Sequence, residues 1–446
     1  MGWTRVRGGE HDGRVPTNGS AILDDLASRG LIQDSTDLDH LRSRLDAGPI
    51  TVYCGFDPSA DSLHVGNLIG LLVMRRFQEA GHRPIVLAGG ATGMIGDPGG
   101  RSEERNLLDD DTLAANLEGI VPQLKAFLDF GDGPNGARLV DNRSWTVAMS
   151  AIDFLRDVGK HVTVNQMLAK EAVRGRIESE HGISYTEFSY MLLQANDFVH
   201  LAELEGCEMQ VGGSDQWGNI SLGVDLVRRR LGRSAHALTW PLLTRPDGTK
   251  YGKSASGEQM WLGAHRMSPY RFYQAWMPVE DSEMRKLLLQ LTFLSPAEVE
   301  EVVSAHDEAP HERLAQRTLA RELTASVHGT DAAAAAEEAS RVLFGGAPVA
   351  EVARGTLEAL SSEIPTSVVV RDRILDGLDL VELTADAGAA KSRSEARQLL
   401  AQGGLAINGE TAAEGRVVTE SDLLHGRYVL LRRGKRAFHL VVAGEH

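Results

Sequence analysis

The first strong pattern in the chain is a short apolar run, followed by a polar turn and an amphipathic helix. Residues 51–54 are apolar or β-branched, which is typical of a strand. Residues 55–63 carry Gly, Pro, Asp and Ser, the usual residues of a turn. From Gly66 onward apolar residues recur near the helical period, and Gly81 predicts the end of that helix.

The start of this predicted helix is suited to binding a phosphate. The first turn of a helix presents free backbone N–H groups and the positive end of the helix dipole. His64 precedes that turn and can donate a hydrogen bond to an anionic oxygen. The pattern therefore outlines a phosphate site at the junction of a strand and a helix.

The rest of the first half alternates predicted strands and helices. Residues 83–88 predict a second strand, which makes a βαβ unit that should be parallel and right-handed. Further strands are predicted at 137–141 and 207–211. Helices are predicted near 22–29, 38–46, 113–128, 146–158 and 163–174. We therefore expect an α/β fold class with a Rossmann-like parallel sheet.

A glycine-rich loop follows the strand at 83–88. It contains six glycines between Gly89 and Gly100. Glycine removes side chains where a ligand must approach the backbone, although an ordinary flexible loop has the same composition. The loop lies after the carboxyl end of a strand, where open α/β sheets bind ligands. Arg101 and Arg105 follow, either as surface charges or as groups that reach back over the site.

The segment 186–198 is apolar nearly all round, so it predicts a buried helix. Tyr190, Gln194 and Asp197 nevertheless share one side of it. Buried polar groups are costly unless they are paired. They form either a hydrogen-bond network inside the core or the wall of a pocket for a polar small molecule, and we favour the pocket because a buried Asp197 needs a strong partner.

Two further loops carry candidate chemistry. Residues 212–219 follow the strand at 207–211, and Ser214 or Asp215 is expected to cap the next helix. A carboxylate in such a position often accepts hydrogen bonds from ribose hydroxyls. Residues 250–254 (KYGKS) nearly match a P-loop but are one residue short between the glycines. They supply two lysines and a hydroxyl, and a surface loop is the alternative.

The C-terminal third changes character. Residues 268–343 are all-helical in pattern, and a linker region with weak helix follows from 345. Beyond residue 380, helical periodicity gives way to short strands and an Asn-Gly turn. This arrangement predicts a compact RNA-binding module, with a solvated charged face as the alternative. Its candidate RNA contacts are Lys391, Arg393 and Arg397 on the second helix and Arg432, Arg433, Lys435 and Arg436 between strands.

Bulk composition excludes several classes. The chain has 446 residues and 42% apolar residues, enough for two or three folded domains. A net charge of −16 argues against a protein that coats nucleic acid indiscriminately. The two cysteines form no disulfide framework and fit a cytoplasmic location. No apolar run approaches the roughly 20 residues of a membrane span.

Five motifs together resemble bacterial tyrosyl-tRNA synthetases. They are residues 53–67, 89–98, 185–198, 210–220 and 250–254, and the C-terminal module resembles the S4 RNA-binding domain of the same family. Residues 64–67 occupy the "HIGH" position of class I synthetases, with Asn67 in place of the second histidine. Residues 250–254 occupy the "KMSKS" position, with Tyr-Gly in place of Met-Ser.

The resemblance implies a role for each matching residue. The tyrosine hydroxyl would meet Tyr53 and Asp197, its ammonium group Asp97, Tyr190 and Gln194, and its carboxylate Gln216. ATP or the adenylate would meet Gly55, Asp57, Ser59, His64, Asn67, Gly212, Asp215 and Lys253. The catalytic group that meets the departing pyrophosphate would include Lys250, Lys253, Ser254, Arg101 and Arg105, together with His64 and Asn67.

The resemblance also implies partners and a domain plan. The substrates would be L-tyrosine, ATP and tRNA(Tyr), with Mg²⁺ carried by ATP and no dedicated metal site, and the enzyme would be a homodimer. The expected divisions are a leader at 1–19, a catalytic domain at 20–247, a mobile loop and connector at 248–267, a helical anticodon-binding domain at 268–344, a linker at 345–376 and an S4-like domain at 377–446.

Other functions remain open from the sequence. One alternative is a synthetase-like RNA-binding protein that has lost catalysis, and another is a related class I synthetase with a different amino-acid specificity. A P-loop ATPase fails on the glycine spacing. Tyr53 and the trio on 186–198 favour tyrosine, and the retained Lys250, Lys253 and His64 favour an active enzyme.

Overall fold

The chain divides into two units, which are described separately. The structure is a computed structural model that describes residues 19–97, 108–178, 182–252, 257–345, 348–434 and 437–444. One unit comprises the chain up to Met267 together with Val279–Leu319, and the other comprises Ser268–Pro278 together with Ala320 onward. The domain boundaries expected from the sequence differ from this division and stay predictions. Most of the predicted leader, 1–18, lies outside the described residues.

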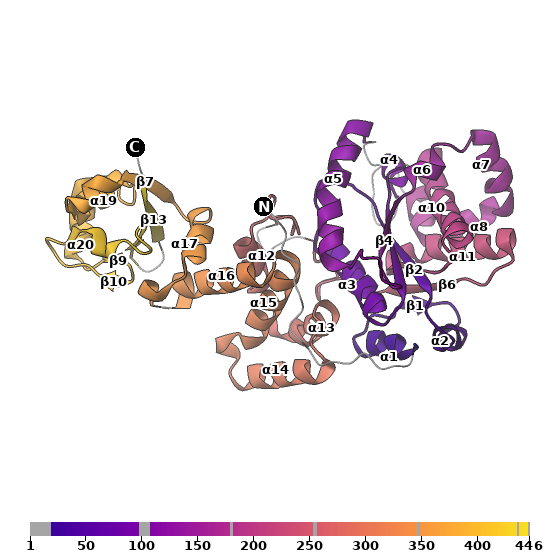
Figure 1. Cartoon of the computed structure of the whole chain (residues 1–446), viewed down its shortest axis with the longest axis horizontal. Coiled ribbons are helices and arrows are strands. Elements are labelled where there is room, and N and C mark those ends of the chain that lie inside the picture. The colour runs from indigo at the N-terminus through magenta and orange to yellow at the C-terminus, as the bar shows by residue number, and fades with distance from the viewer. Residues whose placement is uncertain are drawn as a thin grey trace. The chain divides into compact units, whose positions relative to one another are not determined.

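A six-stranded sheet forms the centre of the first unit (Figure 1). Its strand order is β1-β6-β5-β2-β3-β4, and all neighbouring pairs are parallel except β1 with β6. The strands are β1 (Asp34–Ser35), β2 (Thr51–Phe56), β3 (Arg83–Ala88), β4 (Arg138–Asp141), β5 (Cys207–Gly213) and β6 (His236–Trp240). The predicted α/β class with a parallel sheet is confirmed. β2 and β5 each extend two residues beyond their predicted ends, to Phe56 and Gly213.

Helices cover both faces of this sheet (Figure 1). α3 (Val65–Glu79) and α5 (Asp110–Phe127) lie on one side, and α10 (Tyr185–Leu204) and α11 (Trp217–Leu231) lie on the other. The periodic apolar positions of α3, among them Leu68, Leu72 and Phe77, are fully buried. The remaining helices are α1 (Ala21–Ser28), α2 (Leu38–Asp46), α4 (Thr92–Ile95), α6 (Arg143–Thr146), α7 (Ala151–Asp157), α8 (Val164–Leu168) and α9 (Glu171–Ile177).

Three local predictions in this unit are wrong. The single helix expected near 146–158 is interrupted, because α6 ends at Thr146 and Ser150 caps the separate helix α7 from Ala151. The single helix expected at 163–174 is broken into α8 and α9, because Lys170 adopts an extended backbone with ψ of 135°. Neither Ser214 nor Asp215 caps α11. Ser214–Gln216 forms a 3₁₀ turn instead, and Gln216 precedes the helix without a capping side-chain hydrogen bond.

The first unit also contains two helices from beyond residue 279, α13 (Asp281–Leu291) and α14 (Pro296–Glu308). Arginine side chains hold the carboxyl end of α13 against α1 and α3. Arg29 donates to Leu294 O at 2.9 Å, and Arg76 donates to Thr292 O at 2.5 Å. Both acceptors lie just after the last residue of α13, so the two arginines fix the chain where that helix ends.

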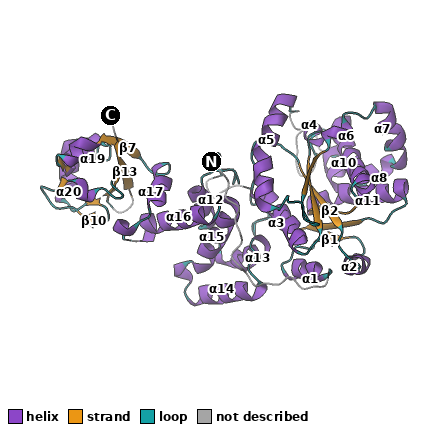
Figure 2. Ribbon diagram, viewed as in Figure 1, coloured by secondary structure: helices purple, strands orange, loops and turns teal. Residues whose placement is uncertain are grey.

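The second unit combines helices with a small sheet (Figure 2). The sheet order is β10-β9-β12-β13-β7, and Asn408 and Gly409 adopt positive φ in the predicted Asn-Gly turn between β9 and β10. Residues 366–370, expected within the linker, form β7, which pairs with β13. The sheet strands are β7 (Thr366–Val370), β9 (Leu405–Ile407), β10 (Glu410–Thr411), β12 (Tyr428–Arg433) and β13 (Ala437–Gly444).

The helices of the second unit are α12 (Pro269–Trp276), α16 (Thr330–Ser340), a π-helical turn at Arg341–Gly345, α17 (Arg354–Ser361), α18 (Arg371–Leu375), α19 (Leu380–Asp386) and α20 (Arg393–Ala401). α15 (Leu314–His328) has residues in both units. The all-helical pattern predicted for 268–343 is confirmed, because α12 to α16 occupy it across both units. A core that includes Ile374, Leu383 and Leu431 packs α18 and α19 against the small sheet.

Candidate active site

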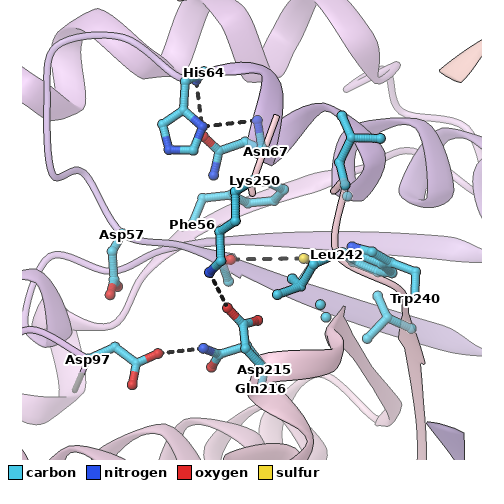
Figure 3. A pocket seen from close by; sticks show the side chains of 18 of the residues that line it. Phe56, Asp57, His64, Asn67, Asp97, Asp215, Gln216, Trp240, Leu242 and Lys250 are labelled. Atoms are coloured by element: carbon cyan, nitrogen blue, oxygen red, sulfur yellow. Dashed lines mark hydrogen bonds and ion pairs between the residues drawn. The ribbon is translucent and has the colours of Figure 1, made fainter. Parts of the chain in front are cut away.

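One cavity of about 750 Å³ opens where the carboxyl ends of β2 and β5 meet the starts of α3 and α11. Its lining includes all of the described residues predicted for tyrosine and ATP: Tyr53, Gly55, Asp57, Ser59, His64, Asn67, Asp97, Tyr190, Gln194, Asp197, Gly212, Asp215, Gln216 and Lys250. Arg101, Arg105, Lys253 and Ser254 lie outside the described residues. Figure 3 shows His64 and Asn67 on one side of the cavity and Asp97, Asp215 and Gln216 on the other.

His64 and Asn67 form a reciprocal cap at the start of α3. The Gly66 N–H donates to His64 Nδ1 at 3.0 Å, and the His64 N–H donates to Asn67 Oδ1 at 3.1 Å. An accepting Nδ1 places the hydrogen of the neutral imidazole on Nε2. A side chain at Gly66 would lie 2.7 Å from the His64 ring, so glycine is needed there. The cap thus orients an imidazole N–H donor and an amide NH₂ group at a helix start.

Asp197 lies at the buried end of the cavity and is 2% exposed. Its oxygens accept hydrogen bonds from Asn142 Nδ2 at 2.9 Å and from Trp145 Nε1 at 2.8 Å. Burial raises the pKa of Asp197 to about 7, and these two hydrogen bonds act against the rise. The strong partner expected for Asp197 is therefore a pair of neutral donors.

The Tyr53 hydroxyl lies at the same buried end, and the described residues offer this buried group no hydrogen-bond partner. Tyr53 is 1% exposed, and its ring packs against Phe198 at a centroid distance of 5.3 Å. Burial raises the pKa of its hydroxyl well above the ordinary value. A neutral phenol without a partner beside a carboxyl group can accept or donate a hydrogen bond to a polar ligand atom.

Carboxylates cluster in the middle of the cavity. Tyr190 donates its hydroxyl to Asp57 at 2.8 Å, and Thr92 donates to the other Asp57 oxygen at 2.9 Å. Gln216 Nε2 donates to Asp97. Burial, together with the negative charges of Asp57 and Asp97, raises the pKa of Tyr190 well above its ordinary value. Two carboxylates so placed favour a cationic ligand group between them.

The polar side of α10 contributes both to a hydrogen-bond network and to the wall of the cavity. Tyr190, Gln194 and Asp197 belong to an internal hydrogen-bond network, and they also line the cavity. Asn219 Nδ2 donates to Gln194 Oε1 at 3.0 Å and to Gln216 Oε1 at 3.3 Å. This shared donor sets the orientation of both glutamine amides.

Two glycines of the loop at 89–100 serve the protein's own side chains. A side chain at Gly89 would overlap Asp57 and Thr92, and one at Gly90 would overlap Asp141. At these positions the interpretation that glycine admits a ligand is wrong, because carboxylates of the chain occupy the space. The loop also contains the short helix α4 rather than being irregular throughout.

Lys250 forms an ion pair with Asp215, the carboxylate expected to contact ribose. Its Nζ lies 3.5 Å from Asp215 Oδ2, an ion pair also drawn in Figure 3. Thr244 pairs with Lys250 in an isolated antiparallel bridge, so the KYGKS sequence begins at the end of a hairpin-like segment. The pair is partly exposed, with side-chain exposures of 57% for Lys250 and 30% for Asp215. Such a pair is weak and can be exchanged for a ligand.

Sequence reasoning missed several residues of this network. Asn142 and Trp145 hold Asp197, Thr92 holds Asp57, and Asn219 holds the two glutamines. Asn142 follows the strand at 137–141 directly, so its position at the carboxyl end of a parallel strand was an available signal. Trp145 and Asn219 carried no local signal of this kind.

The candidate RNA contacts lie in the second unit. Arg393 and Arg397 are on α20, as predicted. Lys391 was also predicted on this helix, but it lies before Ser392, the residue that caps α20. Arg393 pairs with Glu382 at 3.0 Å, and Arg433 pairs with Glu395 at 3.4 Å. Arg432 and Arg433 are the last two residues of β12, so their predicted place between strands is wrong. Lys435 and Arg436 lie outside the described residues.

Among residues that the structure describes, no group of three or more His, Cys, Asp or Glu side chains could hold a metal ion. In the same part of the chain, every helix is too short or too polar to cross a lipid bilayer.

Comparison with known proteins defines the class of this chain. A family model described as "tRNA synthetases class I (W and Y)" matches residues 45–345. A second, described as "Tyrosine--tRNA ligase SYY-like C-terminal domain", matches residues 356–441. The parallel sheet, the capped helix start and these matches define a class I aminoacyl-tRNA synthetase of the tryptophan and tyrosine group.

Named relatives specify the family further. The chain is 53% identical to the tyrosine--tRNA ligase of Opitutus terrae, covering 94% of this chain and 99% of that relative, and 49% identical to that of Roseiflexus castenholzii, covering 95% and 99%. A C-terminally truncated mitochondrial tyrosyl-tRNA synthetase from Aspergillus nidulans matches with a TM-score of 0.66 at 30% identity, covering 72% of this chain and 94% of the other. The chain belongs to the tyrosine–tRNA ligase family.

Proposed function

We propose that this chain activates L-tyrosine with ATP, giving tyrosyl-adenylate and pyrophosphate, and then transfers tyrosine to the terminal adenosine of tRNA(Tyr). The main support is that one cavity joins a buried polar end, with Tyr53 and Asp197, to a capped helix start with His64. The family membership of the chain supports the same activity over an inactive relative or a synthetase for another amino acid.

Substrate tyrosine would lie with its hydroxyl between Tyr53 and Asp197. Its ammonium group would then be near Asp97, Tyr190 and Gln194, where the carboxylates of Asp57 and Asp97 favour a cation. Gln216 would approach the substrate carboxylate with its amide NH₂ group, whose orientation Asn219 supports. All of these groups are held before the ligand arrives, so little ordering is needed on binding.

ATP would lie along the carboxyl ends of β2 and β5. His64, Asn67 and Ser59 would contact it from one side, and Gly55, Asp57, Gly212 and Asp215 would contact the ribose and adjacent groups. The tyrosine carboxylate attacks the α-phosphorus, the bond to the bridging oxygen breaks, and pyrophosphate leaves. The carboxylate is already ionised, so no general base is needed.

Charge grows on the phosphoryl oxygens in the transition state, and donors that meet it there lower the barrier. The proposed donors are the Nε2–H of His64, the amide of Asn67 and the cations Lys250, Lys253, Arg101 and Arg105, with the hydroxyl of Ser254. Lys250 would leave Asp215 when the ribose takes its place, since their exposed ion pair is weak.

Mg²⁺ would enter as part of the ATP substrate. The carboxylates that would lie nearest the phosphates already have partners in the chain. Asp57 accepts hydrogen bonds from Tyr190 and Thr92, and Asp215 pairs with Lys250. That donor set does not resemble the oxygen cage of a resident magnesium site.

The C-terminal parts would bind tRNA. The helical region at 268–344 would contact the anticodon side, and the S4-like part would use Arg393, Arg397, Arg432 and Arg433 together with Lys391, Lys435 and Arg436. Several of these arginines pair with carboxylates, as Arg393 does with Glu382, so phosphates would compete with existing ion pairs.

We also propose a cytoplasmic homodimer. Many of the large apolar side chains that the described residues expose lie in the stretch from α6 to the start of α10, and a gathering of such side chains is typical of an interface. They are Val147, Ile152, Leu155, Val164, Leu168, Ile177 and Tyr185. A second copy of the same surface would cover them, as symmetric dimers do. Cys54 and Cys207 are free and buried, as expected in a reducing compartment.

The direct test of the activity is ATP–pyrophosphate exchange. We expect exchange that requires tyrosine and that tryptophan does not replace, followed by charging of tRNA(Tyr). Exchange driven by another amino acid would reassign the specificity. A folded protein that binds tRNA but supports no exchange would establish the inactive alternative.

A further inference from the structure

The segment after the KYGKS sequence pairs with the main chain around His64. Trp261 and His64 form an isolated antiparallel bridge. The Val65 N–H donates to Met260 O at 2.9 Å, and the Leu262 N–H donates to Leu63 O at 2.8 Å. Residues 260–262 therefore behave as a short strand that holds the chain where it enters α3.

Four side chains surround this pairing, and we call them the Trp261 cluster: Asp61, Trp261, His265 and Arg266. The Arg266 guanidinium lies 4.7 Å from the centroid of the Trp261 ring, and its Nε–H donates to Asp61. His265 Nε2 lies 3.4 Å from the other Asp61 oxygen. The Trp261 ring meets the His64 ring edge-on, with centroids 6.3 Å apart.

Further hydrogen bonds hold the same short segment. Ser62 Oγ accepts from the Gly263 N–H at 2.9 Å, and Gln123 Oε1 accepts from the Leu63 N–H at 3.0 Å. Partial burial acts to raise the pKa of Asp61, but the hydrogen bond and charge of Arg266 outweigh it and lower the pKa. The Asp61 carboxylate is therefore ionised at neutral pH and keeps its attraction for Arg266.

We propose that Trp261, Arg266 and Asp61 are positioning residues for adenylate formation, which hold His64 at the start of α3 in the orientation that meets the phosphates of ATP. None of the three lines the cavity, so they act through His64 and not on the substrate. The proposal rests on the function proposed above. Its physical basis is that a misplacement of about 1 Å in a catalytic group can lower a rate by about 100-fold.

The test compares Trp261→Ala with Trp261→Phe. We expect Trp261→Ala to slow single-turnover adenylate formation at saturating substrates by about tenfold or more. The dissociation constant of tyrosine should change by less than about twofold, because the tyrosine end of the cavity does not contact the cluster. Trp261→Phe should recover the rate to within about threefold of wild type, since it keeps an aromatic face for Arg266.

A matched control and a second pair of variants complete the design. Arg285→Met removes an exposed ion pair with Glu300 away from the cavity and should leave the rate unchanged. Asp61→Asn and Arg266→Met should each slow the rate by about threefold or more, and the double variant should be no slower than the worse single variant. These two residues are half-exposed, so their variants test the proposal even if Trp261→Ala fails to fold.

Three outcomes would overturn the positioning role. One is a wild-type rate in folded Trp261→Ala. Another is an equal loss of tyrosine affinity, rate and melting temperature in Trp261→Ala and Trp261→Phe, which is the signature of structural support alone. Additive losses in Asp61→Asn and Arg266→Met would also do so. If the wild-type chain itself lacks tyrosine-dependent exchange, the proposed function fails, and this result is distinct from those three.

Discussion

Asp197→Ala tests the tyrosine site most directly. The substitution removes a carboxylate that is 2% exposed and leaves Asn142, Trp145 and the Tyr53 hydroxyl facing a small cavity. Tyrosine loses the acceptor for its hydroxyl, whereas phenylalanine has no hydroxyl to lose. In the variant, phenylalanine also no longer leaves a buried carboxylate without a hydrogen-bond donor from the ligand when it binds. We therefore expect discrimination between the two amino acids to fall.

The size of the effect follows from the hydrogen bonds in the site. A hydrogen bond to a charged group contributes about 1.5–3 kcal/mol. At about 1.4 kcal/mol for each factor of ten, the ratio of kcat/KM for tyrosine to kcat/KM for phenylalanine should fall by about 10- to 150-fold. Asp197→Asn is not a milder version of this change, because its NH₂ group would face the N–H of either Asn142 or Trp145.

The assay is ATP–pyrophosphate exchange with each amino acid at about pH 8, where a carboxyl group of pKa about 7 is mostly ionised. Asp24→Ala is the control, because Asp24 is an exposed carboxylate of α1 that pairs only with Arg42 among the described contacts. Its ratio should equal that of wild type. A folded Asp197→Ala protein with wild-type KM for ATP and an unchanged ratio would refute the assignment of Asp197.

Three other predictions concern separate steps. Lys253→Ala should slow adenylate formation, followed by stopped-flow fluorescence, by about 100-fold while tyrosine affinity stays near wild type; an unchanged rate would remove Lys253 from the mechanism. The pKa of Asp197 is higher in the folded protein than the ordinary carboxyl value, so protonated Asp197 stabilises the folded state. This contribution to the free energy of unfolding is lost as pH rises from the ordinary carboxyl range toward 7. Tyrosine affinity, measured by calorimetry, should rise over the same interval up to about pH 8, and a flat profile would contradict this. Ile152→Asp should convert a dimer to monomers in sedimentation velocity, and a dimer of wild-type affinity would place the interface elsewhere.

Local signals in the sequence were sufficient for most of the elements. The apolar run at 83–88 and the helix at 38–46 have the bounds that the pattern predicted. The Asn-Gly turn at 408–409 has the positive φ values that its residue types favour. These features depend on a few neighbouring residues, so periodicity, capping and turn chemistry predict them.

The candidate site was predicted in part for the same reason. The helical spacing of Tyr190, Gln194 and Asp197 placed them on one side of α10, and the positions of His64 and Asp215 after strands placed them at one edge of a parallel sheet. The break at Lys170 and the 3₁₀ turn at Ser214 were missed, because backbone changes of one or two residues leave the apolar period nearly intact.

The sequence by itself thus determined the class of fold and predicted many of the polar side chains that line the cavity. Only the tertiary structure decided which partners those side chains take. Asn142 and Trp145 reach Asp197 across 55 and 52 residues, and Tyr190 reaches Asp57 across 133. Such partners depend on how strands and helices pack around the whole sheet, and no local pattern specifies that distance or direction.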